Sequence, residues 1–223
     1  MSLPFPRAVL FDFDGVVADS ADAHHTAWGA AYEEIFDAPM GPFPTDILAG
    51  KAPSLIADYL ARRAGYPERA QYLYDHKLEL LLAGEPPRLL PGLRSLMELL
   101  QTLAIPFGIA SNAPGPFVRW SAAALRLPVE VVLGVEDFAR PKPAPDPYWQ
   151  LADQLGVPKA DYPYTWILED SLTGMRAAAA TGMCPIGILT QYSEAELLQL
   201  GARICYAAPA GVAARLRALR LLR

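Results

Sequence analysis

Short apolar runs alternate with helix-like periodicity along most of the chain. The runs have the length of buried parallel strands and lie at residues 8–11, 106–110, 129–133, 164–168 and 184–188, with a weaker run at 203–206. Apolar residues at three- and four-residue spacing predict helices at residues 93–103, 116–125, 147–155, 172–181, 193–200 and 211–222. This alternation predicts an α/β fold with a doubly wound, Rossmann-like parallel sheet.

One segment, from about residue 19 to residue 87, has no strand-like run. Helical patterns cover residues 21–36, 45–64 and 67–83, and a proline pair closes the segment. The sequence therefore predicts a helical cap domain at residues 18–87, inserted after the first strand. The catalytic core would comprise residues 1–17 and 88–223, with the cap over its strand ends.

Composition and charge narrow the choice of partner. With 52% hydrophobic and 19% charged residues, extended disorder is excluded. A net charge of −5 without a basic run argues against nucleic acid, and the longest nearly apolar stretch, 177–189, is too short to span a membrane. Cys184 and Cys205 lie in apolar settings, which favours reduced thiols and a cytoplasmic location. The oligomeric state stays open, and a monomer is compatible with the sequence.

Polar residues follow four of the apolar runs. Carboxyl ends of parallel strands meet at one crevice, so these side chains should converge there. Four carboxylates in one crevice need a counter-cation, and oxygen ligands without His or Cys favour Mg²⁺. A lysine would complete a phosphate clamp. The residues are Asp12 and Asp14, Ser111 and Asn112, Lys142, and Glu169 and Asp170.

Each group also has a purely structural interpretation. The two aspartates are compatible with a turn, the Ser-Asn pair with a helix cap, the lysine with a surface loop, and the Glu-Asp pair with the positive end of the following helix. A buried strand ending in two acids, however, has a desolvation cost that a turn does not require. Ser171 is better explained as a helix N-cap than as a catalytic residue.

Taken in order, the motifs resemble those of a known family. Asp12-Phe13-Asp14-Gly15, Ser111-Asn112, Lys142-Pro143 and Glu169-Asp170-Ser171 are similar to the four motifs of the haloacid dehalogenase superfamily. The segments around Lys142 and Glu169 and the helical insert also resemble the subgroup containing phosphoglycolate phosphatase and beta-phosphoglucomutase. The resemblance covers nearly the whole chain.

The resemblance implies a role for each core residue. Asp12 would be the nucleophile that forms an aspartyl-phosphate, and Asp14 the general acid and base, held protonated by like-charge crowding while Mg²⁺ keeps Asp12 ionised. Mg²⁺ would be bound by Asp12, by the backbone carbonyl of Asp14 and by Asp170, with Glu169 in the same shell or acting through water. Lys142 would neutralise Asp12 and the phosphoryl oxygens. Phosphate would be bound by Lys142, Ser111 and the backbone amide of Asn112.

The resemblance is looser in the cap. His24 and Trp28 would contact substrate or line its pocket, although packing of that helix face into the cap explains them equally well. Gly50 and Lys51 resemble a substrate-reading loop, yet an exposed surface lysine explains Lys51 too. The mutase pattern carries an Arg a few residues after the loop glycine, where this sequence has Pro53.

These observations favour a hydrolase: a magnesium-dependent phosphatase acting on a small phosphorylated metabolite, such as a sugar phosphate or a phosphoglycolate-like compound. A beta-phosphoglucomutase-like phosphoryl transferase is the alternative with the same chemistry. A receiver-like phospho-aspartate signalling module is a more distant alternative, because it would need neither Asp14 nor the large insert.

Overall fold

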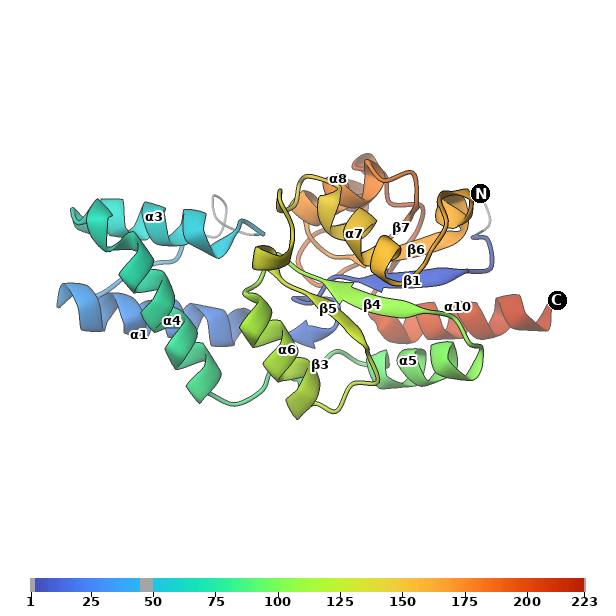
Figure 1. Ribbon diagram of the computed structural model, residues 1–223, viewed down its shortest axis with the longest axis horizontal. Helices are drawn as coiled ribbons and strands as arrows, with labels where there is room; N and C mark the ends of the chain where they lie inside the picture. Colours follow the sequence, from blue (N-terminus) through green and yellow to red (C-terminus); the bar gives the residue numbers. More distant parts are fainter. Residues whose placement is uncertain (1–2, 45–49, 223) are drawn as a thin grey trace.

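The computed structural model describes residues 3–44 and 50–222 and contains the expected parallel sheet (Figure 1). Its six strands lie in the order β5-β4-β1-β6-β7-β8, and every neighbouring pair is parallel. Their bounds are Ala8–Phe11 for β1, Phe107–Ala110 for β4, Val131–Leu133 for β5, Thr165–Glu169 for β6, Cys184–Ile188 for β7 and Cys205–Tyr206 for β8. The apolar runs of the sequence predicted all six.

The first strand lies at the centre of the sheet. All four residues of β1 are buried, because β4 and β6 flank it and helices cover both of its faces. Phe11 is in register with Ile109 of β4 and Leu168 of β6, and the backbone N–H of Asp12 still donates to the carbonyl of Leu168 at 3.0 Å. The chain builds β4 and β5 on one side of β1 and then crosses to the other, so a crevice is expected at this switch point.

Helices cover both faces of the sheet (Figure 1). On one face they pack against Val9 and Phe11, and on the other against Leu10 and Ile167. The first group is α5 (Leu93–Thr102), α6 (Gly115–Ala124) and α10 (Pro209–Leu221); the second is α7 (Asp146–Gln154) and α8 (Leu172–Ala179). A further helix, α9 (Glu194–Gln199), packs in a separate small cluster through Leu197 and Met175. The Ser171 hydroxyl accepts a hydrogen bond from the Gly174 backbone N–H at 2.9 Å, which confirms that Ser171 caps α8.

The inserted region is helical and has its own core. It contains α1 (Ala21–Phe36), α3 (Pro53–Ala64), a 3₁₀ turn (Pro67–Arg69) and α4 (Ala70–Ala83), at the left of Figure 1. Residues 45–49 of the helix expected at 45–64 lie outside the described residues. That helix begins only at Pro53, because proline suits a first helical position while the preceding Ala52 is extended. Apolar residues of all three helices form the cap core: Trp28, Ala31, Tyr32, Ile56, Ala57, Leu60 and Leu73.

A two-stranded antiparallel ribbon joins the inserted region to the core. It pairs β2 (Ala18–Asp19) with β3 (Arg88–Leu89). Strands of two residues carry no hydrophobic alternation, so the sequence pattern could not reveal them. The ribbon brings the two ends of the insert together beside the carboxyl end of β1.

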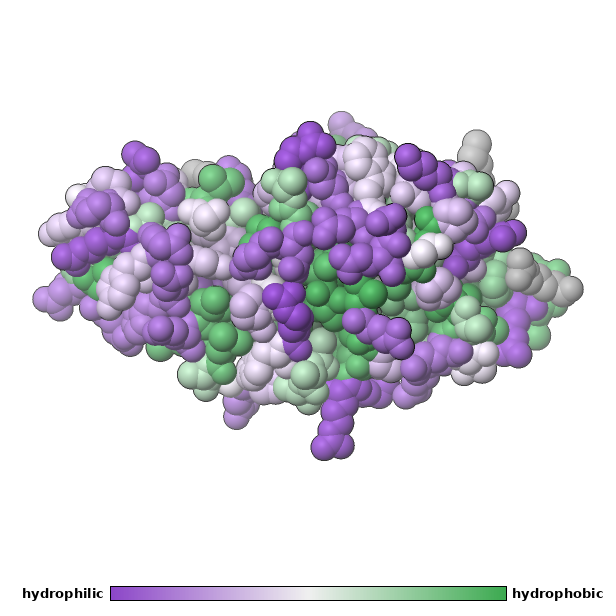
Figure 2. All heavy atoms as spheres, viewed as in Figure 1, coloured by the Kyte–Doolittle hydropathy of each residue, from purple (hydrophilic) through white to green (hydrophobic). Residues whose placement is uncertain are grey.

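The visible surface is mostly a mixture of hydrophilic and hydrophobic residues (Figure 2). Its hydrophobic area near the middle lies over β4 and β5. Elsewhere in the fold, a hollow is lined by Ile105, Pro106, Phe107 and Leu155, among others. Ile105 and Pro106 precede β4 and Phe107 begins it, so the hollow lies at the amino end of this strand, away from the predicted site. Within the described residues, none of the helices combines the length and apolar character needed to cross a membrane.

Candidate active site

The predicted nucleophile lies at the carboxyl end of β1 and is held by the predicted lysine. Asp12 directly follows β1 and is only 6% exposed. Lys142, from the loop before α7, donates from Nζ to Oδ1 of Asp12 at 2.6 Å. The sheet therefore brings into contact two charged groups that are 130 residues apart in the sequence.

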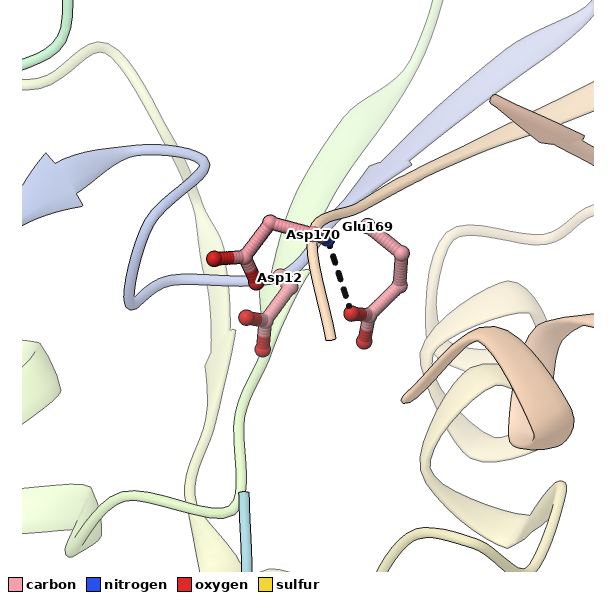
Figure 3. A group of neighbouring side chains, drawn as sticks. All are labelled: Asp12, Glu169 and Asp170. Carbon is pink, nitrogen blue, oxygen red and sulfur yellow. Dashed lines mark hydrogen bonds between the residues drawn. The ribbon is translucent and has the colours of Figure 1, made fainter. Parts of the chain in front are cut away.

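The second acidic pair lies at the end of β6, beside Asp12. Glu169 ends the strand and Asp170 follows, and one oxygen from each of these three acids lies within 4.8 Å of the others (Figure 3). Two glycines leave room for them. A Cβ on Gly15 would lie 1.9 Å from Oδ2 of Asp170, and one on Gly174 would lie 1.8 Å from Oε1 of Glu169. Larger residues at these positions would displace the carboxylates.

Glu169 and Asp170 differ in their hydrogen bonding. Oε1 of Glu169 accepts from Lys142 at 2.6 Å and Oε2 accepts from the backbone N–H of Asp170 at 3.1 Å. Oδ2 of Asp170 accepts from Thr190 at 2.8 Å, but the buried Oδ1 has no hydrogen-bond partner among the described residues. In Figure 3 the carboxylates of Asp12 and Asp170 lie together, while that of Glu169 turns away from them. Asp170 thus offers a buried, free oxygen next to Asp12.

The three carboxylates of Asp12, Glu169 and Asp170 outnumber the single ammonium of Lys142 that contacts them. Burial raises the pKa of Asp12 to about 8, although Lys142 lowers it, and the charge of Glu169 adds to the rise. Burial and the charge of Asp12 hold the pKa of Asp170 well above its usual range. A divalent cation would relieve this shortage, and the free oxygen of Asp170 and the all-carboxylate donor set fit a hard cation. The cluster of Asp12, Glu169 and Asp170 could therefore hold a metal ion.

Asp14 faces the cap. Its Oδ1 accepts from the Ser20 hydroxyl and lies 3.3 Å from Nε2 of His24, and its Oδ2 accepts from the Ser111 hydroxyl at 3.5 Å. Burial raises the pKa of Asp14, but the nearby His24, the Ser20 hydroxyl and the charge of Lys77 together outweigh burial, so that the pKa is lowered. This direction differs from the expectation that like-charge crowding keeps Asp14 protonated while Mg²⁺ holds Asp12 ionised. Carboxylates surround Asp12, whereas basic groups of the cap face Asp14.

A buried lysine of the cap supports His24. Lys77 on α4 is fully buried, its Nζ lies 2.9 Å from Nδ1 of His24, and it sits over the Trp28 ring at 5.1 Å from the ring centroid. Burial lowers the pKa of Lys77 to about 7, although the charge of Asp14 raises it. Burial and the charge of Lys77 also lower the pKa of His24. Asp14, His24 and Lys77 thus form a continuous chain from the core into the cap.

Ser111 and Asn112 follow β4, as predicted. The Ser111 hydroxyl accepts from the backbone N–H of Ala113 at 3.0 Å and donates to Oδ2 of Asp14 at 3.5 Å. The Asn112 side chain donates to the carbonyls of Gly50 at 3.0 Å and Lys142 at 3.1 Å, and accepts from the Lys142 N–H at 3.0 Å. This side chain therefore ties the lysine loop to the cap.

The four cap candidates have different positions. His24 reaches Asp14, and Gly50 reaches the core through its carbonyl. Trp28 is only 2% exposed and belongs to the cap core, the placement expected if this helix face packs into the cap. Lys51 is exposed.

The motif geometry agrees with a comparison against protein families. The model of the haloacid dehalogenase-like hydrolases matches residues 6–182. The chain belongs to this family. As a haloacid dehalogenase-like hydrolase, the protein is an enzyme, and the resemblance inferred from its motifs is confirmed.

Relatives of this hydrolase include two enzymes of similar length. It is 28% identical to beta-phosphoglucomutase of Bacillus subtilis over 193 residues, covering 82% of this chain and 83% of the relative. It is 26% identical to phosphoglycolate phosphatase of Yersinia pseudotuberculosis over 200 residues, covering 86% and 84%. CbbY of Rhodobacter sphaeroides, solved in complex with xylulose-(1,5)bisphosphate, shares the fold with a TM-score of 0.78 at 23% identity, covering 92% of this chain and 95% of CbbY.

Sequence reasoning missed several residues around the hydrolase site. Lys77 had a detectable signal, because it lies between Leu73 and Leu81 at four-residue spacing on the buried face of α4. Tyr148 and Thr190 had none. Tyr148 has the apolar ring expected at a helix position that faces the core, and Thr190 lies in a loop after β7. Only the folded chain brings their hydroxyls to Glu169 and Asp170.

Proposed function

We propose that this hydrolase is a magnesium-dependent phosphatase of small phosphomonoesters that works through an aspartyl-phosphate on Asp12. The observation that carries the proposal is the contact of Asp12 with Lys142 beside the free carboxylate oxygen of Asp170. Oxygen of Asp12 attacks phosphorus, the bond to the alkoxide oxygen breaks, and water later displaces the aspartate from phosphorus. Lys142 and the site's hydroxyl and amide groups stabilise the phosphoryl charge.

Asp14 would transfer the protons of both halves of the reaction. It lies within 3.5 Å of Ser111, the predicted phosphate ligand, so it would face the leaving oxygen. The neighbouring His24 lowers its pKa, so Asp14 must gain a proton to act as an acid. A bound phosphate ester brings negative charge, which raises the pKa of Asp14 and favours this proton uptake.

Magnesium would be held by Asp12 and Asp170, with Glu169 and the carbonyl of Asp14 completing the protein's contribution. When bound, it would neutralise charge on the nucleophile and on the phosphoryl group. We assign residues 18–87 to a cap and residues 1–17 and 88–223 to the catalytic core. A cap over the crevice restricts the substrate to a small metabolite and excludes water. Free thiols at Cys184 and Cys205 are compatible with a cytoplasmic location.

A beta-phosphoglucomutase-like transferase is the second candidate, favoured by the identity to the Bacillus enzyme. Hydrolysis is preferred for two reasons, both of which concern the anchoring of a second phosphate. The buried lysine of the cap, Lys77, is already paired with His24 and is therefore not available as such an anchor. Pro53 stands where the mutase pattern has an Arg, so the described cap lacks that anchor for a second phosphate.

The test is phosphate release from a panel of esters with and without Mg²⁺. The panel would include phosphoglycolate, sugar phosphates and an aryl phosphate, and Asp12→Asn would be compared with Asp153→Asn, an exposed matched control. We expect Mg²⁺-dependent turnover in the wild type and the control, and none in Asp12→Asn. Conversion of glucose 1-phosphate with a bisphosphate, without phosphate release, would support the mutase instead. A single modification without turnover would support a signalling module.

A further inference from the structure

A buried tyrosine lies behind the predicted catalytic lysine. Tyr148, in the first turn of α7, has no solvent exposure. Its hydroxyl donates to Oε1 of Glu169 at 2.5 Å and accepts from Nζ of Lys142 at 2.8 Å. The hydroxyl therefore links the two groups that surround the nucleophile but does not itself reach Asp12.

The protein holds this tyrosine in place from two directions. Its ring packs in the core cluster that contains Leu10, Leu151 and Ile167. The preceding loop is closed by two hydrogen bonds from Arg140 to Asp146, each 2.9 Å long. A side chain fixed in this way places its hydroxyl accurately, which is the condition for orienting a neighbour.

Lys142 uses all of its hydrogen-bonding capacity in this arrangement. Its ammonium has three N–H donors, and its partners are Asp12, Glu169 and Tyr148, at 2.6, 2.6 and 2.8 Å. The ammonium also sits over the Tyr148 ring, 4.7 Å from the centroid. Without the hydroxyl, one N–H would be left unpaired in a buried site, and the ammonium would be free to turn toward Glu169.

We propose that Tyr148 is a positioning residue whose hydroxyl keeps Lys142 aligned on Asp12 and holds the Glu169 carboxylate back from the nucleophile. This inference rests on the proposed phosphatase function. Burial, reinforced by the charge of Glu169, raises the pKa of Tyr148 well above its ordinary value, so the phenol keeps its proton. Small displacements of an aligned group reduce the rate far more than they reduce substrate binding.

The test compares Tyr148→Phe with Tyr162→Phe. Phenylalanine keeps the ring beneath the ammonium and removes only the hydroxyl, and Tyr162 packs against the same core cluster. We expect Tyr148→Phe to lower kcat by about 10- to 100-fold with KM within about threefold, while Tyr162→Phe changes neither by more than about twofold. An equal effect of both variants, or a rise in KM with unchanged kcat, would overturn the proposal.

A double-mutant cycle shows whether the tyrosine acts through its partner. In a Glu169→Gln background, Tyr148→Phe should reduce kcat by less than about threefold, because the pair it organises is already broken. If the two losses simply multiply, the hydroxyl does not act through Glu169, and the positioning role is wrong.

A binding measurement separates this inference from the proposed phosphatase activity. Calorimetry in the presence of Mg²⁺ would compare vanadate, which mimics the transferring phosphoryl group, with inorganic phosphate. Tyr148→Phe should weaken vanadate binding at least about tenfold and phosphate binding less than about threefold. Equal weakening of both ligands would contradict the inference. If the wild type cleaves no ester, the phosphatase proposal itself fails; if it cleaves esters but this difference is absent, only the role of Tyr148 fails.

Discussion

The carboxyl end of the sheet holds its charged groups in direct mutual contact, whereas the cap reaches the same site through a few hydrogen bonds. Asp12, Lys142 and Glu169 are buried, and Nζ of Lys142 donates to one carboxylate oxygen of each acid at 2.6 Å. The cap contributes the approach of His24 to Asp14 and the carbonyl of Gly50 on Asn112. Under the proposed mechanism, this difference assigns the phosphoryl chemistry to the core and the adjustment of proton transfer and access to the cap.

The electrostatics of the two regions differ in the same way. In the core, burial and neighbouring acids raise the pKa of Asp12 and Asp170. At the cap, basic groups lower the pKa of Asp14 in spite of its burial. The acids of the core therefore favour the binding of a cation, whereas Asp14 beside the cap favours its ionised form, which can accept a proton.

The largest effect is expected from removing the metal, because all of its proposed side-chain ligands lie in the core. Chelation should reduce phosphate release to the level without enzyme, because the acids of the site are then left without their counter-ion.

The free energy of unfolding should also depend on the metal. The folded pKa of Asp12, about 8 against an ordinary 3.8, means that the folded chain binds a proton that the unfolded chain lacks between these values. Without Mg²⁺, the free energy of unfolding should therefore decline as the pH rises from about 4 to about 8.

Mg²⁺ takes the place of the proton on Asp12, so the stabilisation that Mg²⁺ provides should increase with pH. We expect the Mg²⁺-induced rise in Tm to be larger at pH 8 than at pH 5 by at least about 2 °C. Thermal unfolding at both pH values measures it, with Asp170→Asn as the variant in which the rise should shrink. A rise in Tm that is independent of pH would show that the cation does not replace this proton.

The next largest effect is expected at Asp14, where the two regions meet. Asp14→Ala should slow both halves of the reaction by about 10²- to 10⁴-fold, because no other described carboxylate takes its place. Aspartyl-phosphate should accumulate if attack is less affected than hydrolysis. Rapid quenching followed by mass measurement detects it, and an unaltered rate would remove Asp14 from the mechanism.

A smaller effect is expected inside the cap. Lys77→Met keeps the length of the side chain and removes its positive charge, so kcat should fall by about tenfold while Tm changes little. Steady-state rates and thermal unfolding measure the two quantities. Lys159→Met makes the same change at an exposed core position and is the matched control. Equal rates in both variants would mean that the cap charge does not influence the chemistry.

The smallest effect is expected at Lys51. As an exposed lysine, it should change kcat/KM by less than about twofold for every ester when replaced by Ala. Kinetics with esters that carry a second anionic group provide the check. A clear rise in KM confined to those esters would show that Lys51 binds the second anionic group and that the cap contributes more to substrate recognition than expected.

The sequence by itself determined the parallel sheet, the helical insert and the polar residues at the strand ends. A strand such as β1 is buried on both faces, so its continuous apolar run can be recognised in the sequence alone. Residues that directly follow parallel strands lie at the same edge of the sheet, so their side chains can be grouped into one site. Asp12, Lys142 and Asp170 could therefore be named before the fold was known.

Only the tertiary structure decided how these groups are bonded and charged. Which oxygen of Asp170 is free, how Tyr148 orients Lys142, and why Asp14 has a lowered pKa all depend on residues brought together from distant parts of the chain. Lys77 lies 53 positions from its partner His24. Hydrogen bonds and pKa shifts act over a few ångströms, and a linear pattern carries no information on such distances.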